Sequence, residues 1–368
     1  MQRKKILCVV GTRPEVIKMA PVIFAIKKEK WAEVRVIATA QHRELLDQIL
    51  DTFDIVPDVD FNIMRSNQGL TLLTARLLTE LDTLLSAEKP DAVLAQGDTT
   101  TVFAVALACF YHQIRFGHVE AGLRTGDMRN PFPEEMNRII ATKFATWHFT
   151  PTEAARQNLL AEKISENAIY LTGNTVIDSL KLVAARQPDA GVALDRSKRL
   201  LILTAHRREN FGAPFREICQ AVLTIVRQNA NVQVLYPVHP NPNVQDIAHE
   251  ILGRHPRIIL CPPMNYQAFI GAMQRAYLIL SDSGGIQEEA PALGKPVLVL
   301  RNESERPEAI AAGCAKLVGT DQAQIVRETQ RLLDDTAAYE QMARGVSPYG
   351  DGRATARIIG VLKADLCA

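Results

Sequence analysis

The chain has 368 residues, too many for one ordinary hydrophobic core, so its length predicts two domains. Apolar residues make up 47% and charged residues 23% of the sequence, as in ordinary globular proteins, and the net charge of +1 argues against nucleic acid or an acidic membrane as a partner. No apolar stretch is long enough for membrane insertion, and the six scattered cysteines form no C-x-x-C pair, so we expect a cytoplasmic protein with reduced, buried thiols.

Short apolar runs alternate with longer runs of helical periodicity along the first half of the chain. The expected strands are residues 4–10, 34–39, 91–96, 114–119 and 147–150. The expected helices between them include residues 15–29, 70–86 and 100–111. Continuous apolar strands of this kind predict a parallel sheet that helices cover on both faces.

The same alternation repeats in the second half. The expected strands there are residues 199–206, 232–238, 257–261, 276–282 and 296–301. Two successive runs of alternating strand and helix predict two doubly wound α/β domains, with the boundary near TGNT (172–175), just before the polar, linker-like stretch 187–199. Because ligands bind beyond the carboxyl ends of parallel strands, two such domains facing each other predict a ligand cleft.

The segment GTRPE (11–15) follows the first expected strand. Gly11 permits a tight turn, and Pro14 suits the first turn of a helix, whose exposed N–H groups favour an anion. Arg13 adds a planar donor that matches phosphate, and Lys18 lies about one turn further on. An ordinary capped turn explains this segment equally well, so by itself it leaves a phosphate site open.

Three acidic residues occupy comparable positions in the first half. Asp98 in QGDTTT and Glu120 in HVEAG each follow an expected strand. Beside Glu120, Gly122 allows a ligand or another segment to approach the backbone closely. Glu134 in NPFPEE begins a Pro-initiated helix, where a carboxylate also complements the helix dipole. Each alone has a structural explanation such as N-capping. Together they predict a site.

The strand ends of the second half carry complementary chemistry. The segment TAHRREN places His206 beside two arginines, and SDSGGIQEEA opens a helix whose N–H groups suit a diphosphate. The residues that we expect against the diphosphate at that helix are Ser283, Gly284 and Gly285. The spacing matches neither G-x-G-x-x-G nor a P-loop. Glu289 is a candidate for the ribose hydroxyls and Phe269 for the base, so the pattern predicts a sugar nucleotide with its sugar against the carboxylates.

Motifs along nearly the whole chain resemble one known family. They are GTRPE with Lys18, AQHRELLDQ, QGDTTT, GHVEAGLRTGD, FPEEMNR, LTGNTVID, HRREN, YPVHPNPNV, LSDSGGIQEEAPALGKPVL, ERPEA and SPYGDG. In this order they resemble the bacterial non-hydrolysing UDP-N-acetylglucosamine 2-epimerases. The resemblance implies the GT-B fold: residues 1–172 with 351–368 form one Rossmann-like domain that carries the carboxylates, and 173–350 form a second that binds UDP. The last helix, about 351–366, would return to the first domain.

The resemblance also implies the chemistry. Family members interconvert UDP-GlcNAc and UDP-ManNAc by eliminating UDP to 2-acetamidoglucal and adding it back, usually as homodimers that supply ManNAc units for surface polysaccharides. It assigns proton transfer and oxocarbenium stabilisation to Asp98, Glu120 and Glu134, without deciding which residue handles which proton. His206, Arg13 and Lys18 would steady the leaving diphosphate. We expect no cofactor and no metal.

Some family members bind a second UDP-GlcNAc as an activator. The residues in matching segments are Gln41, His42, Gln68, Arg207 and His239. Three other functions stay open at this point. A hydrolysing epimerase would release free ManNAc, a GT-B glycosyltransferase would need an acceptor surface, and a silent sugar-nucleotide sensor would not need the acid–base set.

Overall fold

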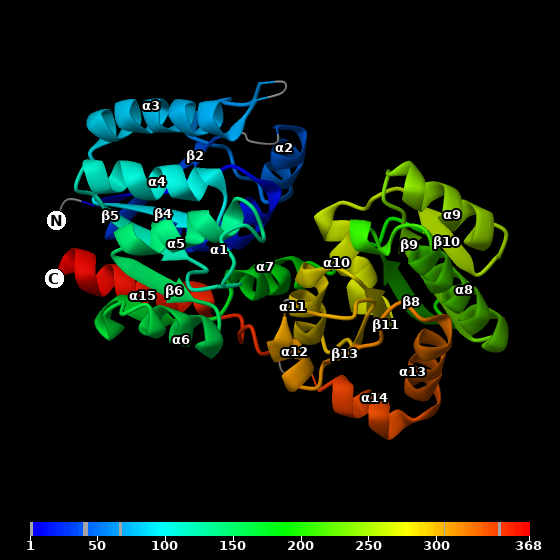
Figure 1. Cartoon of the computed structure of the whole chain (residues 1–368). Helices are drawn as coiled ribbons and strands as arrows, with labels where there is room; N and C mark the ends of the chain where they lie inside the picture. Colours follow the sequence, from blue (N-terminus) through cyan, green and yellow to red (C-terminus); the bar gives the residue numbers. More distant parts are fainter. Residues whose placement is uncertain (1–2, 40–42, 66–67, 305, 345–346) are drawn as a thin grey trace. The chain divides into compact units, whose positions relative to one another are not determined.

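A computed structural model describes residues 3–39, 43–65, 68–304, 306–344 and 347–368. The chain divides into two compact units (Figure 1). Unit 1 consists of Met1–Ser179 and Tyr349–Ala368, and unit 2 of Leu180–Pro348. Each unit is built around one parallel β-sheet with helices on both faces.

The sheet of unit 1 has seven parallel strands in the order β3-β2-β1-β4-β5-β6-β7. The strands are β1 (Lys4–Val10), β2 (Ala32–Ala38), β3 (Val59–Asp60), β4 (Ala92–Gln96), β5 (Arg115–Val119), β6 (Trp147–Thr150) and β7 (Ile169–Leu171). The middle strands are buried along their whole length, as the continuous apolar runs predict. The predicted doubly wound sheet is therefore confirmed in this unit.

Helices cover both faces of this sheet. They are α1 (Arg13–Lys28), α2 (Arg43–Thr52), α3 (Leu70–Glu88), α4 (Thr100–Tyr111), α5 (Glu134–Phe144), α6 (Glu153–Ala161), the first part of α7 (Thr175–Ala184) and α15 (Ala354–Cys367). On one face α3 packs against α4, and α4 packs against α5. Helix α3 buries a leucine at every fourth position, from Leu73 to Leu85, in the core that it shares with α4. On the other face α15 packs against α1 (Figure 1).

The sheet of unit 2 has six parallel strands in the order β10-β9-β8-β11-β12-β13. The strands are β8 (Arg199–Thr204), β9 (Val232–Pro237), β10 (Ile258–Cys261), β11 (Ala276–Ser281), β12 (Val297–Val299) and β13 (Ala315–Leu317). The helices are α8 (Ala213–Gln228), α9 (Pro242–Leu252), α10 (Tyr266–Arg275), α11 (Gly284–Ala292), α12 (Pro307–Ala311), α13 (Gln322–Asp334) and α14 (Thr336–Met342). Helices α8, α9 and α13 bury their apolar faces against the sheet in one continuous core.

The division between the units lies later than the expected boundary near TGNT. Thr172, Asn174 and Thr175 are buried in unit 1, and the chain passes into unit 2 within α7, after Ser179. The polar stretch 187–199 is a loop inside unit 2, where Gln233 donates to the Asp195 carbonyl. The polar composition of this stretch indicated a surface loop, but a surface loop need not be a boundary between domains.

The chain passes from unit 2 back to unit 1 at Tyr349, and contacts of the following residues explain this position. The amide of Asn174 donates to the carbonyl of Tyr349 at 2.6 Å, before the expected return at residue 351. The carboxylate of Asp178 then accepts from the amides of Ala354 and Thr355, at 3.2 and 2.9 Å. A carboxylate at this position satisfies free N–H groups in the first turn of α15 and so anchors that helix to α7.

Candidate active site

Glu120 lies directly after β5, at the carboxyl end of the sheet of unit 1. Its φ of +64° is left-handed, a conformation that non-glycine residues rarely adopt. Lys18, on α1, places its ammonium nitrogen 2.5 and 2.7 Å from the two carboxylate oxygens. Gln96 and Asn174 also donate to this carboxylate, Asn174 at 3.1 Å. The Glu120 side chain is 5% exposed, so a buried negative charge is held by one cation and two amides.

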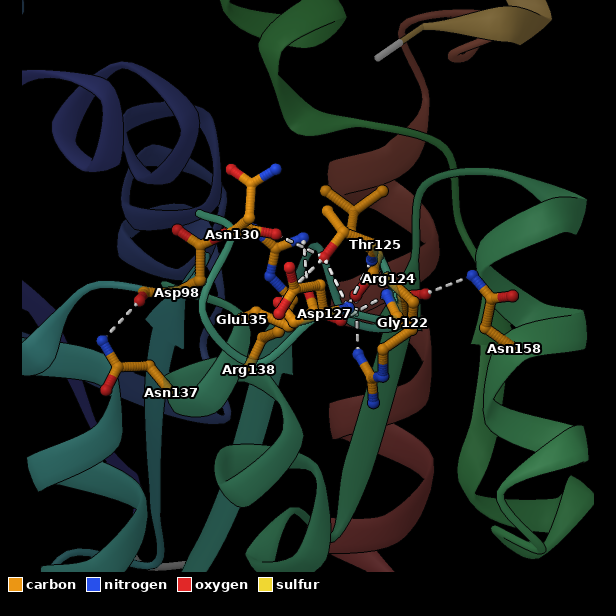
Figure 2. Close-up of polar contacts among 12 residues, drawn as sticks. Asp98, Gly122, Arg124, Thr125, Asp127, Asn130, Glu135, Asn137, Arg138 and Asn158 are labelled. Atoms are coloured by element: carbon orange, nitrogen blue, oxygen red, sulfur yellow. Dashed lines mark hydrogen bonds and ion pairs between the residues drawn. The ribbon is translucent and has the colours of Figure 1, made fainter. Parts of the chain in front are cut away.

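Asp98 lies in the turn between β4 and α4 and is oriented by helix α5. The guanidinium of Arg138 lies 2.8 Å from the Asp98 carboxylate, and the Asn137 side chain donates to the Asp98 carbonyl at 2.8 Å. Figure 2 shows both contacts coming from the same helix. Burial raises the pKa of Asp98, Arg138 opposes this, and nearby Glu120 and Glu134 add to the rise.

Glu135 links this helix to the loop after Gly122. Its carboxylate is fully buried, accepts from the amides of Thr125 and Gly126 at 3.0 and 3.1 Å, and lies 3.3 Å from Arg138. Arg138 therefore stands between the carboxylates of Asp98 and Glu135 (Figure 2). This arrangement fixes both the Asp98 turn and the loop relative to α5.

Glu134 is the first residue of α5, as the Pro-initiated pattern predicts. It is partly exposed, and its charge contributes to the electrostatic field at Asp98, as do those of Glu120 and Lys18. The structure thus brings the three predicted carboxylates and Lys18 to one end of one sheet. Partly buried carboxyl groups close to one another and to a lysine can exchange protons with a bound molecule.

The start of α1 forms the neighbouring edge of the site. Thr12 caps the helix in a capping box, and the Glu15 carboxylate accepts from the amides of Gly11 and Thr12, at 2.5 and 2.8 Å, and from the Thr99 hydroxyl at 2.5 Å. Burial raises the pKa of Glu15 to about 7, while these hydrogen bonds oppose the rise. Arg13 is the first residue of the helix and is half-buried.

His118 holds the turn that contains Asp98 through a hydrogen bond to its backbone. Its Nε2 is 2.7 Å from the carbonyl of Gly97, so the ring donates a hydrogen bond to the residue before Asp98. Burial lowers the pKa of His118 to about 4, which keeps the ring neutral at pH 7. His118 therefore acts as a fixed donor in the framework of the turn.

In unit 2, the candidate residues gather at the carboxyl ends of β8 and β11. Asp282 is fully buried directly after β11 and accepts from the amides of His206 and Arg207, both at 2.8 Å. The side chain of Asn210 donates to the same oxygen at 3.2 Å. His206 stacks on His239, with ring centroids 5.7 Å apart and planes 11° apart.

The first turn of α11 is open to an anion. Its N-cap, Ser283, makes no side-chain capping bond, and a Cβ built on Gly284 or Gly285 would meet nothing closer than 4.0 Å. The free N–H groups of such a turn bind phosphate well. Glu289, further along the helix, is 8% exposed and accepts from the Tyr266 hydroxyl at 2.9 Å, so it is not a solvated surface charge. Phe269 on α10 is half-buried.

The residues suggested for an activator site are spread over both units. Gln41 and His42 lie outside the described residues. Gln68, before α3, accepts from the Arg65 amide and the Arg76 guanidinium, both at 3.0 Å. Arg207 and His239 belong to unit 2, where both influence the charge of His206.

Several supporting residues were not predicted from the sequence. They are Glu15, Gln96, Glu135, Arg138, Asn174, Asn210, Tyr266 and Asp282. One of them had a visible signal, because Arg138 follows Glu135 at the i,i+3 spacing that pairs charges on a helix. Among the described residues, no group of three or more His, Cys, Asp or Glu is arranged to hold a metal, and no helix is long and apolar enough to cross a membrane.

The chain is similar to known proteins in sequence and in structure. Residues 24–363 match the family model described as UDP-N-acetylglucosamine 2-epimerase. Curated UDP-N-acetylglucosamine 2-epimerases of Salmonella typhimurium and Escherichia coli K12 are 52% and 51% identical, with 98% of each chain covered.

Solved structures agree with these matches. The Neisseria meningitidis UDP-GlcNAc 2-epimerase bound to UDP-GlcNAc is 43% identical with a TM-score of 0.88, covering 98% of this chain and all of that one. The Staphylococcus aureus MnaA–UDP structure is 44% identical with a TM-score of 0.85, covering 99% of this chain and 97% of that one. A glycotransferase of kitacinnamycin, 12% identical with a TM-score of 0.69, shares the fold alone. The predicted GT-B class, with two Rossmann-like domains, is confirmed, and the chain belongs to the UDP-N-acetylglucosamine 2-epimerase family.

Proposed function

We propose that the protein is a non-hydrolysing UDP-N-acetylglucosamine 2-epimerase that interconverts UDP-GlcNAc and UDP-ManNAc. The observation that carries this proposal is the cluster of Asp98, Glu120 and Glu134 beside Lys18 in a chain 52% identical to a curated enzyme of that name. Epimerisation at C2 needs proton transfer at carbon, and this cluster supplies carboxyl groups for it.

The reaction proceeds by elimination and addition. The hydrogen at C2 of the sugar is not next to a carbonyl, so simple deprotonation is implausible. Instead C2 loses a proton, the C2–H electron pair forms a C1=C2 double bond, and the C1–O bond breaks with its electron pair departing on UDP. This leaves 2-acetamidoglucal. UDP then returns to C1 as a proton reaches the opposite face of C2, so atoms and charge balance in both directions.

The carboxyl groups of unit 1 have three tasks in this scheme. They accept a proton from one face of C2, deliver one to the other face, and stabilise positive charge near C1. Burial raises the pKa of Asp98, and a carboxyl group with a raised pKa is a better proton acceptor than an ordinary carboxylate. Lys18 compensates the charge of Glu120 and keeps that carboxylate in place.

Unit 2 would hold the nucleotide. The open first turn of α11, with Ser283, Gly284 and Gly285, suits the diphosphate, and Glu289 suits the ribose hydroxyls. His206, Arg13 and Lys18 would steady the diphosphate as charge builds on it, and Phe269 would border the uracil. The Neisseria structure is bound to UDP-GlcNAc and the Staphylococcus structure contains UDP, which supports a uridine nucleotide as the ligand of this chain.

The test is NMR of UDP-GlcNAc incubated with the protein in heavy water. We expect intact UDP-ManNAc with deuterium at C2. A product that keeps its original C2 hydrogen contradicts the elimination route. Free ManNAc with stoichiometric UDP would instead identify a hydrolysing epimerase, in which water captures the intermediate.

We further propose a homodimer that operates in the cytoplasm and supplies ManNAc units for surface polysaccharide. Phe110 and Tyr111 on α4 are 58% and 69% exposed and lie with Phe144 in an aromatic patch that a second copy would cover. Light scattering after gel filtration tests this, and a monomeric mass at micromolar concentration contradicts it.

Activation by a second UDP-GlcNAc is the remaining part of the proposal. Gln68, Arg207 and His239, together with Gln41 and His42, are its candidate ligands. The expected result is sigmoidal kinetics with UDP-GlcNAc and no turnover of UDP-ManNAc until UDP-GlcNAc is added. Hyperbolic kinetics in both directions would remove the activator site.

A further inference from the structure

The two carboxylate oxygens of Asp282 differ in their hydrogen bonding. Oδ2 accepts from the amides of His206 and Arg207 and from the side chain of Asn210. Oδ1 is buried and has no hydrogen-bond donor among the described residues, and it lies 3.4 Å from Nδ1 of His206. Leaving a buried carboxylate oxygen without a donor is unfavourable, so a small rotation of the His206 ring toward it is favoured.

The His206 ring is more exposed than the carboxylate that it faces. Its side chain is 41% exposed, whereas the carboxylate of Asp282 is fully buried and held by its three other donors. In an imidazole ring the two nitrogens point in different directions. When Nδ1 faces Asp282, Nε2 therefore faces away from the buried carboxylate.

The charges around His206 act in opposite directions. Burial lowers the pKa of the ring, and His239 and Arg207 lower it further, while Asp282 raises it. His239 stacks on the ring and Arg207 is the next residue of the chain. Asp282 thus favours the protonated His206 ring, whereas burial, His239 and Arg207 favour the neutral ring.

We propose that Asp282 is a positioning residue that fixes His206 in the Nδ1–H tautomer and stabilises the imidazolium when a diphosphate lies against Nε2. The proposal rests on the proposed function of His206 at the leaving diphosphate. Solvent supplies the second proton, since the ring is partly exposed. The protonated ring then donates from Nδ1 to Asp282 and from Nε2 to the departing phosphate oxygen.

The variant Asp282→Asn separates this role from a structural one. The two backbone amides need an acceptor, so the amide oxygen of the new side chain takes the place of Oδ2. Its NH2 group then faces His206, where it can only donate. Nδ1 must become the acceptor, and the ring changes to the Nε2–H tautomer without a large change of shape.

Asn210→Ala is the matched control. It removes a donor to Asp282 and a bond to the carbonyl of Leu300, so it disturbs the same loop. It leaves Oδ1 of Asp282 and its relation to His206 unchanged. A purely structural role for Asp282 predicts that both variants affect His206 in the same way.

The experiment is 15N NMR of histidine-labelled full-length protein, titrated with and without UDP. The chain has eight histidines, and the signals of His206 are those lost in His206→Asn. We expect the Nδ1–H tautomer at high pH in the wild type and in Asn210→Ala, and the Nε2–H tautomer with a lowered His206 pKa in Asp282→Asn. UDP should raise the His206 pKa in the wild type and much less in Asp282→Asn.

Turnover completes the test. The kcat of Asp282→Asn should fall by about 10²–10⁴-fold, with a larger effect on kcat than on KM. An Nε2–H tautomer in the wild type, or equal His206 pKa values in the wild type and Asp282→Asn, overturns the inference. Full turnover by His206→Asn would instead contradict the proposed role of His206 in the reaction, which the NMR titration does not depend on.

Discussion

Lys18 and Glu120 form a buried ion pair that joins α1 to the end of β5. The ammonium nitrogen lies 2.5 and 2.7 Å from the two carboxylate oxygens, and the side chains are 16% and 5% exposed. Breaking a buried pair by removing one partner is costly, because the other charge is left uncompensated. The pair therefore connects the stability of unit 1 to the carboxylate cluster proposed for proton transfer.

Substitution of this pair separates stability from turnover. We expect Lys18→Met to lower the free energy of unfolding by about 3 kcal/mol, since it leaves the Glu120 carboxylate buried without a cation. Glu120→Gln should cost less, because Gln96 and Asn174 still find an acceptor. The double variant should regain much of the stability that Lys18→Met loses and still lack turnover. Guanidinium unfolding and NMR of the products measure both quantities, and a fully stable Lys18→Met contradicts the expectation.

Asp98→Asn should lower kcat by about 10²–10⁴-fold, the usual contribution of a general acid or base. The binding of UDP should change little, because the candidate nucleotide contacts lie at α11 of unit 2. Isothermal titration with UDP, beside the turnover assay, provides the comparison. Wild-type turnover would remove Asp98 from the proton-transfer set.

The pH dependence of activity should depend on Arg138. Burial raises the pKa of Asp98, and Glu120 and Glu134 add to the rise, while Arg138 lowers it. Arg138→Met removes the opposing cation, so the pKa of Asp98 should rise further. If Asp98 reacts as the carboxylate, the acidic limb of the kcat/KM profile moves to higher pH than in the wild type, because Asp98 is protonated over a wider range.

Arg138→Lys is the control for that experiment. It keeps a positive charge near Asp98 but loses the planar contact that Arg138 shares between Asp98 and Glu135. Its acidic limb should lie between those of the wild type and Arg138→Met. Identical limbs in all three proteins would mean that Asp98 does not set the pH dependence.

Nucleotide affinity should depend on Glu289. We expect Glu289→Ala to weaken UDP binding by about tenfold, the effect of losing one hydrogen bond to a charged group, or about 1.5 kcal/mol. Tyr266→Phe is the matched variant, since it removes the hydroxyl that donates to Glu289 and leaves the carboxylate in place. It should weaken binding less. Wild-type affinity in Glu289→Ala would contradict the ribose assignment.

Gly122 should tolerate no side chain. A Cβ there would lie 2.3 Å from the carbonyl oxygen of Ala155, and its φ is +92°. Gly126 provides the control, because its φ of +82° is similar and its Cβ would meet nothing within 4 Å. Gly126→Ala should cost about 1–2 kcal/mol from the backbone conformation alone, and Gly122→Ala clearly more. Equal unfolding midpoints for the two variants would contradict the packing argument.

Much of the fold follows from local sequence patterns. Each expected strand occurs within a few residues of its predicted bounds, because continuous apolar runs mark strands that are buried on both sides. The strands that were not predicted, β3, β7 and β13, have two or three residues each, which is too short for any periodicity to appear.

The site was only partly predictable. The placing of Asp98, Glu120 and Glu134 at one end of one sheet could be predicted, because each is a polar residue just after a strand or at a helix start. Their partners could not, because those side chains come from other segments: Asn174 lies 54 positions after Glu120. Asp282 stood inside an expected strand, and only the folded structure reveals its buried contacts with the residues after β8.

The return of α15 to unit 1 has a consequence for biosynthesis. Unit 2 is one continuous segment, whereas unit 1 needs residues on both sides of it. The ribosome therefore synthesises all of unit 2 before it translates α15, the helix that packs against α1. Domains generally fold as units during synthesis, so the half that carries the carboxylates is completed last.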